Sequence, residues 1–280
     1  MRPPRPALTV MPLKVRKSLR QAMFHLRSRR LHQDAALEIR ALEGRGDGGM
    51  IVFTSYHANA AKRGLLEFAS SASDGGARHC IFVTDRRQGW FQGEGLAQAI
   101  PRAVSDYVRR HGLRRLMTVG VSMGGYGALS FAAALGAGRA LALAPQFCPR
   151  PQTFPADRRW IETRSRIEDF TRPALDQAMG GDIRYTLLHG RRNPEDARHW
   201  QAFPQGPGIH HYLTDRDTHD VVDPLRAAGI LYPVIDAVWK DDQDRVNTLM
   251  QRIRAVPRAW GERALDLHSQ PAAAVSCATS

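Results

Sequence analysis

The sequence predicts an α/β fold: a mostly parallel sheet flanked by helices. Three observations support this prediction. Short apolar segments bounded by turn residues alternate with segments of helical periodicity, a serine bracketed by glycines stands at one strand–helix junction, and the composition is that of an ordinary globular protein, with 43% hydrophobic and 24% charged residues. Strands that alternate with helices favour parallel pairing through right-handed crossovers. With 280 residues, the chain is long enough for one large or two small domains.

The predicted strands are short runs rich in branched and aliphatic residues. They cover residues 36–42, 50–56, 79–85, 113–121, 139–145, 182–190 and 208–215. Between the first two, the run EGRGDGG is typical of a hairpin-type turn.

The predicted helices follow from apolar residues at helical spacing. They cover residues 14–31, 59–72, about 95–111, 125–137, 193–203, 223–240 and 241–256. The proline-containing stretch at residues 146–181 is less regular, and we expect it to form a small cap over one end of the sheet.

The N-terminal residues concentrate the positive charge of the chain. Nine Lys or Arg and no acid precede Leu31, and they account for most of the formal net charge of +13. Apolar residues recur on one face of the 14–31 helix, so this segment could lie on an anionic membrane surface, bind nucleic acid or dock on its own protein, and plain docking or solvation is the default. An Arg-rich, acid-free start also resembles an organelle transit peptide.

These features predict three regions. Residues 1–33 form a basic arm with an irregular start, residues 34–265 form the α/β domain with the cap at 146–181, and residues 266–280 form a disordered tail. Three cysteines at unrelated spacings make neither a disulfide framework nor a metal cluster. With no secretory signal pattern and no long apolar run, we expect a cytoplasmic protein, with the arm as a peripheral membrane contact.

The motif Gly120-x-Ser122-x-Gly124 between a strand and a helix has the form of a nucleophile elbow. The strained turn holds the Ser122 hydroxyl above the end of the sheet, and the glycines avoid Cβ collisions with the neighbouring strand and helix. The first helical turn directs backbone N–H groups towards negative charge beside Ser122, and the N–H of Met123 would be one oxyanion donor. A glycine-rich loop that serves only close packing is the alternative.

The run SMGGYGAL resembles the elbow of the α/β-hydrolase superfamily, in its esterase-D-like and feruloyl-esterase-like branches. The runs ALAPQF, DRRQGWFQ and THDVVDPLRAAGIL are similar to a group of bacterial hydrolases found near polysaccharide genes. The superfamily likeness covers about residues 36–255. It implies an α/β-hydrolase fold and catalytic partners in the order Ser, acid, His.

The resemblance points to His219 as the general base. Of the six histidines after Ser122, only His219 lies in a loop after the last predicted strand and before a closing helix, where the superfamily places its histidine. A serine hydroxyl needs such a base, and the imidazole needs a carboxylate to orient it. The alternative is a loop histidine bonded to Asp217 or Asp220.

The acid should follow the strand at 182–190, where Glu195 and Asp196 both occur. We favour Asp196, partly because members of the similar bacterial group place an aspartate there. Glu195 stays open, as does a plain role for both residues in the first helical turn. The superfamily often has an aspartate directly after that strand, whereas His189-Gly190-Arg191 stands here.

Further site residues are expected on the loops after the strands at 50–56 and 79–85. The second oxyanion donor would be a backbone N–H near Ser55 or Tyr56, and we favour Tyr56. His57 and Trp90 are candidate substrate-binding residues. The end of the predicted strand at 79–85 offers three more candidates for the border of the site, Asp85, Arg86 and Arg87.

The sequence therefore predicts a serine hydrolase that cleaves a carboxylic ester, a small-molecule or saccharide ester, through an acyl-enzyme. It implies no metal and no organic cofactor. An acyltransferase with the same three residues, or a non-catalytic binding module with a hydrolase fold, are the alternatives. Nucleic-acid binding ranks lowest, because no recognised nucleic-acid-binding motif accompanies the basic arm.

Overall fold

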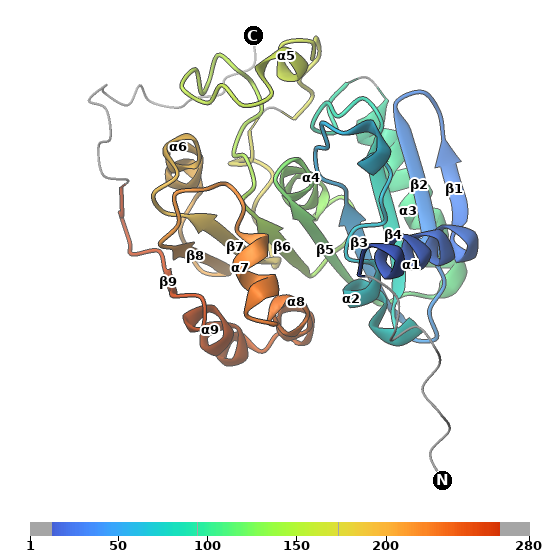
Figure 1. Cartoon of the computed structure of the whole chain (residues 1–280). Helices are drawn as coiled ribbons and strands as arrows, with labels where there is room; N and C mark the ends of the chain where they lie inside the picture. The colour runs from blue at the N-terminus through green and yellow to red at the C-terminus, as the bar shows by residue number, and fades with distance from the viewer. Residues whose placement is uncertain (1–12, 94, 173, 264–280) are drawn as a thin grey trace.

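The computed structural model describes residues 13–93, 95–172 and 174–263. A single nine-stranded sheet crosses the molecule in the order β1-β2-β4-β3-β5-β6-β7-β8-β9 (Figure 1). The six strands from β4 to β8 in this order are parallel, whereas β1, β2 and β9 run antiparallel to their neighbours at the two edges. The predicted mostly parallel α/β sheet is confirmed. The expected irregular start and disordered tail lie outside the described residues.

The strands span β1 (Arg29–Gln33), β2 (Leu37–Leu42), β3 (Gly48–Phe53), β4 (His79–Asp85), β5 (Arg115–Val121), β6 (Arg139–Leu143), β7 (Arg184–Gly190), β8 (Ile209–Thr214) and β9 (Ala255–Pro257). The α-helices span α1 (Leu13–Arg27), α2 (Ala69–Ser73), α3 (Leu96–His111), α4 (Met123–Phe131), α5 (Ile161–Arg164), α6 (Pro194–Ala202), α7 (Val222–Ala227), α8 (Leu231–Lys240) and α9 (Gln243–Gln251).

The hydrophobic core lies on both faces of the sheet. In β3, Ile51 and Phe53 pack with α3 and α4 on one face, whereas Met50 and Val52 pack with α2, α7, α8 and α9 on the other. This follows from the alternation of side chains along a strand. Strands β3 and β4 are buried over their whole length, which explains why they read as continuous apolar runs rather than alternating ones.

Two predictions near the N-terminus are wrong. The first helix ends at Arg27 rather than Leu31, and the next residues form β1, which pairs with β2. Arg40 explains the helix end, since its guanidinium donates to the carbonyl oxygens of His25 and Ser28. The run EGRGDGG is not a hairpin, because β4 lies between β2 and β3 in the sheet.

The predicted helix at 59–72 is also wrong. Only a short 3-10 turn at Ala60–Lys62 and the helix α2 form there. Gly64 and Phe68 adopt left-handed backbone conformations, with φ of 78° and 57°, which interrupt a continuous helix.

The two C-terminal helices are shorter than predicted. Gly229, with φ of 66°, divides the 223–240 segment into α7 and α8. The last predicted helix is α9, which ends at Gln251 and is followed by the edge strand β9.

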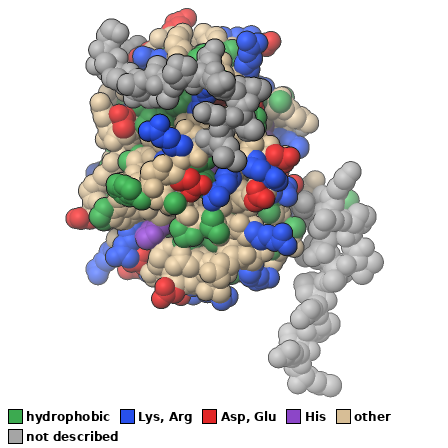
Figure 2. All heavy atoms as spheres, turned by 90° about the vertical axis from the view of Figure 1, so that its left-hand side faces the viewer, with side chains coloured by type: hydrophobic (Ala, Val, Ile, Leu, Met, Phe, Trp, Pro, Cys, Tyr) green, Lys and Arg blue, Asp and Glu red, His purple; other side chains and the backbone are tan. Residues whose placement is uncertain are grey.

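On the side of the molecule that carries α6, α9 and β9, basic and acidic side chains are interspersed (Figure 2).

The 146–181 segment contains the short helix α5 and lies above the strand ends in Figure 1. Its place follows from its contacts, because Arg159 bonds to Asp196 and Trp160 packs against His219. Among the described residues, no helix is long and apolar enough to cross a membrane.

Candidate active site

A sharp turn joins β5 to α4 at Ser122, the position where the motif predicts a nucleophile elbow. Ser122 has φ of 52° and ψ of −119°, a backbone conformation that a residue with a side chain rarely adopts. A Cβ on Gly120 would lie 2.1 Å from the carbonyl oxygen of Gly124, and a Cβ on Gly124 would lie 2.2 Å from that of Phe53. Only glycine fits at either position, so the helix can start directly against β3 and present the Ser122 side chain.

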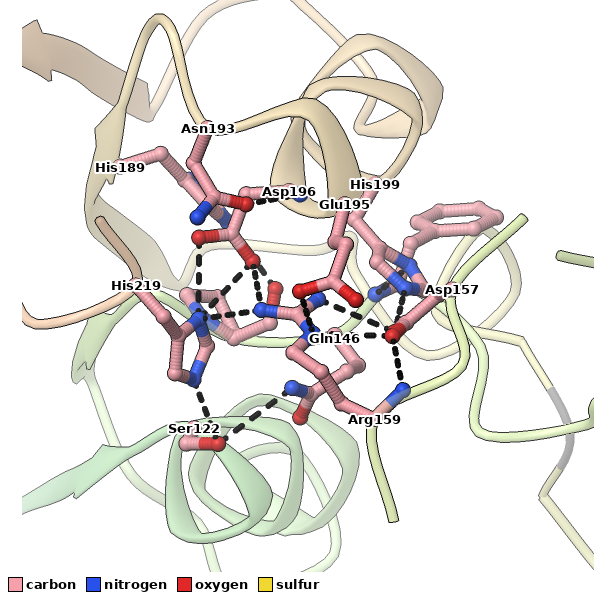
Figure 3. Close-up of polar contacts among 12 residues, drawn as sticks. Ser122, Gln146, Asp157, Arg159, His189, Asn193, Glu195, Asp196, His199 and His219 are labelled. Carbon is pink, nitrogen blue, oxygen red and sulfur yellow. Dashed lines mark hydrogen bonds and ion pairs between the residues drawn. The ribbon is translucent and has the colours of Figure 1, made fainter. Parts of the chain in front are cut away.

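Ser122, His219 and Asp196 form a continuous hydrogen-bonded chain (Figure 3). The Ser122 Oγ lies 2.8 Å from the Nε2 of His219, and the Nδ1 of His219 lies 2.9 Å from each carboxylate oxygen of Asp196. Because a carboxylate only accepts hydrogen bonds, Nδ1 carries the proton and Nε2 accepts from the serine hydroxyl. This is the tautomer that lets an imidazole take a proton from the serine.

The start of α6 positions Asp196. Asn193 is the N-cap, and its side-chain oxygen accepts from the backbone N–H of Asp196 at 2.8 Å. Pro194 occupies the first helical position, where its missing N–H costs nothing. The Asn193 amide also donates to the carbonyl oxygen of Asp217, which joins the helix start to the loop of His219.

Gly190, at the end of β7, lets this loop pass close to the sheet. A Cβ there would lie 2.8 Å from the carbonyl oxygen of Thr218 and 3.0 Å from that of Arg216. The sequence His189-Gly190-Arg191, which replaces the aspartate expected directly after this strand, therefore accommodates the backbone next to His219.

Asp196 is almost fully buried and charged. Burial by itself raises its pKa, but the favourable interactions with His219 and Arg159 outweigh burial and hold the pKa well below its usual range. Asp196 thus remains an anion across the pH range in which most enzymes act.

Arg159, from the 146–181 segment, contacts three carboxylates. Its guanidinium lies 2.7 Å from Asp196, 2.8 Å from Asp157 and 3.2 Å from Glu195. Its Nη1 also lies 2.8 Å from the Nδ1 of His219. Since both of these nitrogens carry protons, we interpret this contact as two donors that share one oxygen of Asp196, not as a hydrogen bond.

Asp157 extends the polar network behind Arg159. Its carboxylate accepts from the Nε2 of His199 at 2.9 Å, and the other ring nitrogen of His199 accepts from the backbone N–H of Phe147. Hydrogen bonds from His199 and Arg159 outweigh the effect of burial and lower the pKa of Asp157. The 146–181 segment is therefore tied to α6 by buried charged groups.

Gln146 is a site residue that the sequence reasoning missed. It follows β6, has no exposed surface, and its Nε2 donates to the Ser122 Oγ at 3.3 Å. The Nε1 of Trp90 donates to the Oε1 of Gln146 at 3.0 Å, which defines the orientation of the amide. The run ALAPQF was a signal for this position, because it places a polar side chain directly after a buried strand at the active edge.

Trp90, a candidate substrate-binding residue in the sequence, is buried in the structure. It has no exposed surface, so it supports Gln146 instead of lining open space. The half-buried rings of Tyr56 and Trp160 lie beside it, with centroids 5.4 Å apart, and the Trp160 ring packs edge-on against His219 at 5.4 Å. Aromatic surface therefore borders the His219 side of the site.

Tyr56 differs from the residues beside it in the backbone after β3. The Ser55 N–H donates to Glu67 and the His57 N–H donates to Gln88, whereas for Tyr56 no backbone acceptor occurs among the described residues. The N–H of Met123 lies in the first turn of α4, where no intrahelical acceptor exists. These two N–H groups are the expected oxyanion donors.

The other expected bordering residues have structural partners. The His57 ring lies 2.7 Å from Glu67, and its side chain is partly exposed. Asp85 is buried and accepts from the backbone N–H groups of Arg87, Gly89 and Phe91, and burial raises its pKa to about 6 despite these bonds. Asp85 therefore organises the loop of Trp90.

Arg86 and Arg87 are exposed on that loop. Arg86 donates to the backbone oxygen of Asp34, in the turn between β1 and β2, so its guanidinium is directed to the sheet edge.

Comparison with known proteins identifies the fold. No protein-family model and no curated protein sequence matches the chain. Among solved structures, the Gap123 glycosylation-associated protein complex of Streptococcus agalactiae is similar at a TM-score of 0.56 and 14% identity over 79% of this chain. The match covers 48% of that protein, so this chain spans about half of its length.

Two further solved structures cover nearly all of their own length. The capsule O-acetyltransferase of Neisseria meningitidis serogroup A is similar at a TM-score of 0.51 and 13% identity, over 74% of this chain and 93% of that one. An alpha-beta serine hydrolase homologue from Coxiella burnetii is similar at a TM-score of 0.44 and 12% identity, over 73% and 94%. With its sheet order and the sharp turn at Ser122, this chain has the α/β-hydrolase fold.

Proposed function

We propose that the protein is a serine hydrolase that cleaves a carboxylic ester with a Ser122–His219–Asp196 triad. The observation that carries the proposal is the 2.8 Å contact between the Ser122 Oγ and the His219 Nε2, in line with a buried, charged Asp196. A serine activated in this way is a nucleophile for acyl groups.

In the first half-reaction, the Ser122 oxygen attacks the ester carbonyl while His219 takes the hydroxyl proton. Asp196 stabilises the imidazolium that forms. The N–H groups of Met123 and Tyr56 would donate to the oxyanion, and His219 then passes its proton to the departing alcohol. An acyl group on Ser122 remains.

In the second half-reaction, His219 takes a proton from water, and the resulting hydroxide attacks the acyl carbon. The bond to the Ser122 oxygen breaks, the serine regains its proton from His219, and a carboxylic acid leaves. The Gln146 amide also donates to the Ser122 oxygen, and the aromatic surface of Tyr56 and Trp160 suits an apolar acyl group or the face of a ring.

A fluorophosphonate probe, which phosphonylates activated serines, tests this proposal. We expect the wild-type protein to be labelled, Ser122→Ala to lose all labelling, and Ser130→Ala, in the same helix, to be labelled like the wild type. Labelling of Ser122→Ala at the wild-type rate would exclude Ser122 as the nucleophile. A folded wild-type protein that takes no label would favour a non-catalytic binding module.

A second candidate is an acyltransferase with the same three residues. Two observations support it: Ser122 is only 6% exposed beneath the 146–181 segment, which would restrict water, and a solved structure of similar fold is an O-acetyltransferase. Product analysis with an activated acetyl ester separates the two candidates. A hydrolase releases acetate whether or not an alcohol or sugar is added, whereas a transferase forms the acetylated alcohol in preference to acetate.

A further inference from the structure

Helix α1 exposes a continuous apolar stripe. Its four members, Val15, Leu19, Met23 and Leu26, are 44%, 41%, 52% and 88% exposed. They are spaced by four, four and three residues, so they share one side of the helix. Four exposed large apolar side chains in one row differ from the scattered singles that are normal on a protein surface.

The opposite side of α1 is the one that docks on the protein. The side-chain amide of Gln21 makes two hydrogen bonds to the backbone of Leu66, each 3.1 Å long, and Phe24 packs against the hydrophobic core. At 100° per residue, Gln21 and Phe24 lie roughly opposite the stripe. The helix is therefore held in place by one face while its apolar stripe points away from the sheet.

Basic side chains border the stripe. Arg20 and Arg27 are exposed, and helical geometry places them next to the Met23 edge of the stripe. No acidic residue occurs before Leu31, whereas on the side of α6, α9 and β9 both signs are mixed (Figure 2). The positive charge and the exposed apolar surface thus coincide on one helix.

We propose that α1 binds an anionic lipid surface, with the stripe among the headgroups and the arginines beside lipid phosphates. Such a surface is the one partner that uses both features, because apolar side chains enter the interface and cations are attracted by anionic lipids. Nucleic acid would use the arginines but not the stripe. A second copy would bury the stripe but bring like charges together.

The docked state of the helix favours this role. An isolated amphipathic peptide loses conformational entropy when it folds on a membrane, whereas α1 is already helical and attached through Gln21 and Arg40. The proposal concerns binding only and does not depend on the proposed hydrolase activity.

Vesicle flotation with the full-length protein tests the stripe. We expect binding to phosphatidylcholine vesicles that contain about 30% phosphatidylglycerol, weaker binding at about 0.5 M salt, and little binding to phosphatidylcholine alone. The double variant Leu19→Gln with Met23→Gln should lower the partition coefficient about tenfold or more. Ser18→Gln, exposed on the same helix but outside the stripe, should bind like the wild type.

A second pair of variants tests the charge. Arg20→Gln with Arg27→Gln should lower binding to anionic vesicles about tenfold or more. Arg102→Gln with Arg110→Gln removes the same net charge from exposed positions on α3 and should bind like the wild type. Circular dichroism and the midpoint of urea unfolding check that each variant is folded.

Three results would overturn the proposal. The first is a wild-type protein that does not float with anionic vesicles. The second is a stripe variant that floats as well as the wild type while binding to a DNA duplex depends on Arg20 and Arg27, which would indicate a polyanion site. The third is a wild-type dimer in light scattering that the variant Leu19→Gln with Met23→Gln converts to a monomer, which would make the stripe a contact between copies.

Discussion

The Nη1 of Arg159 and the Nδ1 of His219 share one carboxylate oxygen of Asp196, at 2.7 Å and 2.9 Å. These two nitrogens lie 2.8 Å apart, one in a guanidinium cation and the other in an imidazole that becomes a cation when it takes up a proton. A positive charge at this distance opposes the formation of an imidazolium, but Asp157 and Glu195 also bind the guanidinium and offset its charge. In the proposed mechanism, Arg159 is therefore a positioning residue for Asp196.

Arg159→Gln should lower kcat about tenfold and leave KM nearly unchanged, because Asp196 loses a charge-assisted hydrogen bond that helps to orient it against His219. Arg159→Lys, which keeps a positive charge beside the three carboxylates, should recover part of the loss. Arg158→Gln, an exposed neighbour, should leave kcat unchanged. Initial rates on a chromogenic ester measure these differences.

The rescue by lysine, together with urea unfolding, separates this role from a purely structural one. If Arg159→Gln lowers the free energy of unfolding but keeps the wild-type kcat, the guanidinium holds the 146–181 segment in place without acting on Asp196 or His219.

Asp196→Asn should lower kcat by about 10³- to 10⁴-fold. An amide at this position can donate to the Nδ1 of His219, which would favour the tautomer that cannot accept the serine proton. Glu195→Gln is the matched control, since Glu195 contacts Arg159 at the partly exposed edge and should change kcat less than about threefold. The reverse ranking, measured on a chromogenic ester, would make Glu195 the acid.

Gln146→Leu should lower kcat about tenfold to a hundredfold and leave KM nearly unchanged. The substitution keeps the volume of the side chain but removes the donor that orients the Ser122 oxygen. Trp90→Phe removes the N–H that holds the Gln146 amide, along with part of a buried ring, but leaves the Gln146 donor in place, so its effect on kcat should be smaller and in the same direction. A Gln146→Leu enzyme with the wild-type kcat would show that this bond plays no part in the reaction.

Gly120→Ala should destabilise the protein by about 3 kcal/mol or more, as measured by urea unfolding. The new Cβ would lie 2.1 Å from a backbone oxygen that cannot move without displacing α4. Gly138→Ala is the control, because no atom lies within 4 Å of a Cβ there. An unchanged unfolding midpoint for Gly120→Ala would contradict the tight packing of the elbow.

The free energy of unfolding should fall as the pH drops from 6.5 towards 4. Burial lowers the pKa of His189 to about 4, and burial together with His189 lowers the pKa of His211 well below its usual value. Both side chains take up a proton more readily in the unfolded chain, so their contribution is complete above pH 6.5 and lost below it. At pH 5 the loss for His189 is about 2 kcal/mol.

Urea unfolding at pH 7.5 and pH 5 measures this loss. In His189→Gln the difference between the two pH values should shrink by about 2 kcal/mol, even though the variant is less stable at pH 7.5. Phe203→Leu, which alters the ring packed against His189, should lower stability at both pH values and keep the wild-type difference. An equal difference in His189→Gln and the wild type would contradict a neutral, buried His189.

The local patterns that the sequence predicts correctly are those set by neighbours along the chain. The sharp turn at Ser122 depends on two glycines within two residues of it, and the parallel strands depend on short apolar runs, so both are legible in the sequence. The helix at 59–72 was wrong because helical periodicity there competes with left-handed conformations at Gly64 and Phe68, which periodicity does not report.

What the sequence determined by itself is a set of candidate residues: a serine in a glycine-rich turn, followed by a histidine in a loop and two acids in one helical turn. Only the tertiary structure shows which acid contacts the histidine, since the side chains at 195 and 196 diverge by about 100° around α6 and Asp196 is the one that bonds to His219. The contacts of Gln146 and Arg159, and the outward direction of the α1 stripe, likewise depend on segments far apart in the chain. Such contacts leave no period or spacing in the sequence, because they arise only when the folded chain brings these segments together.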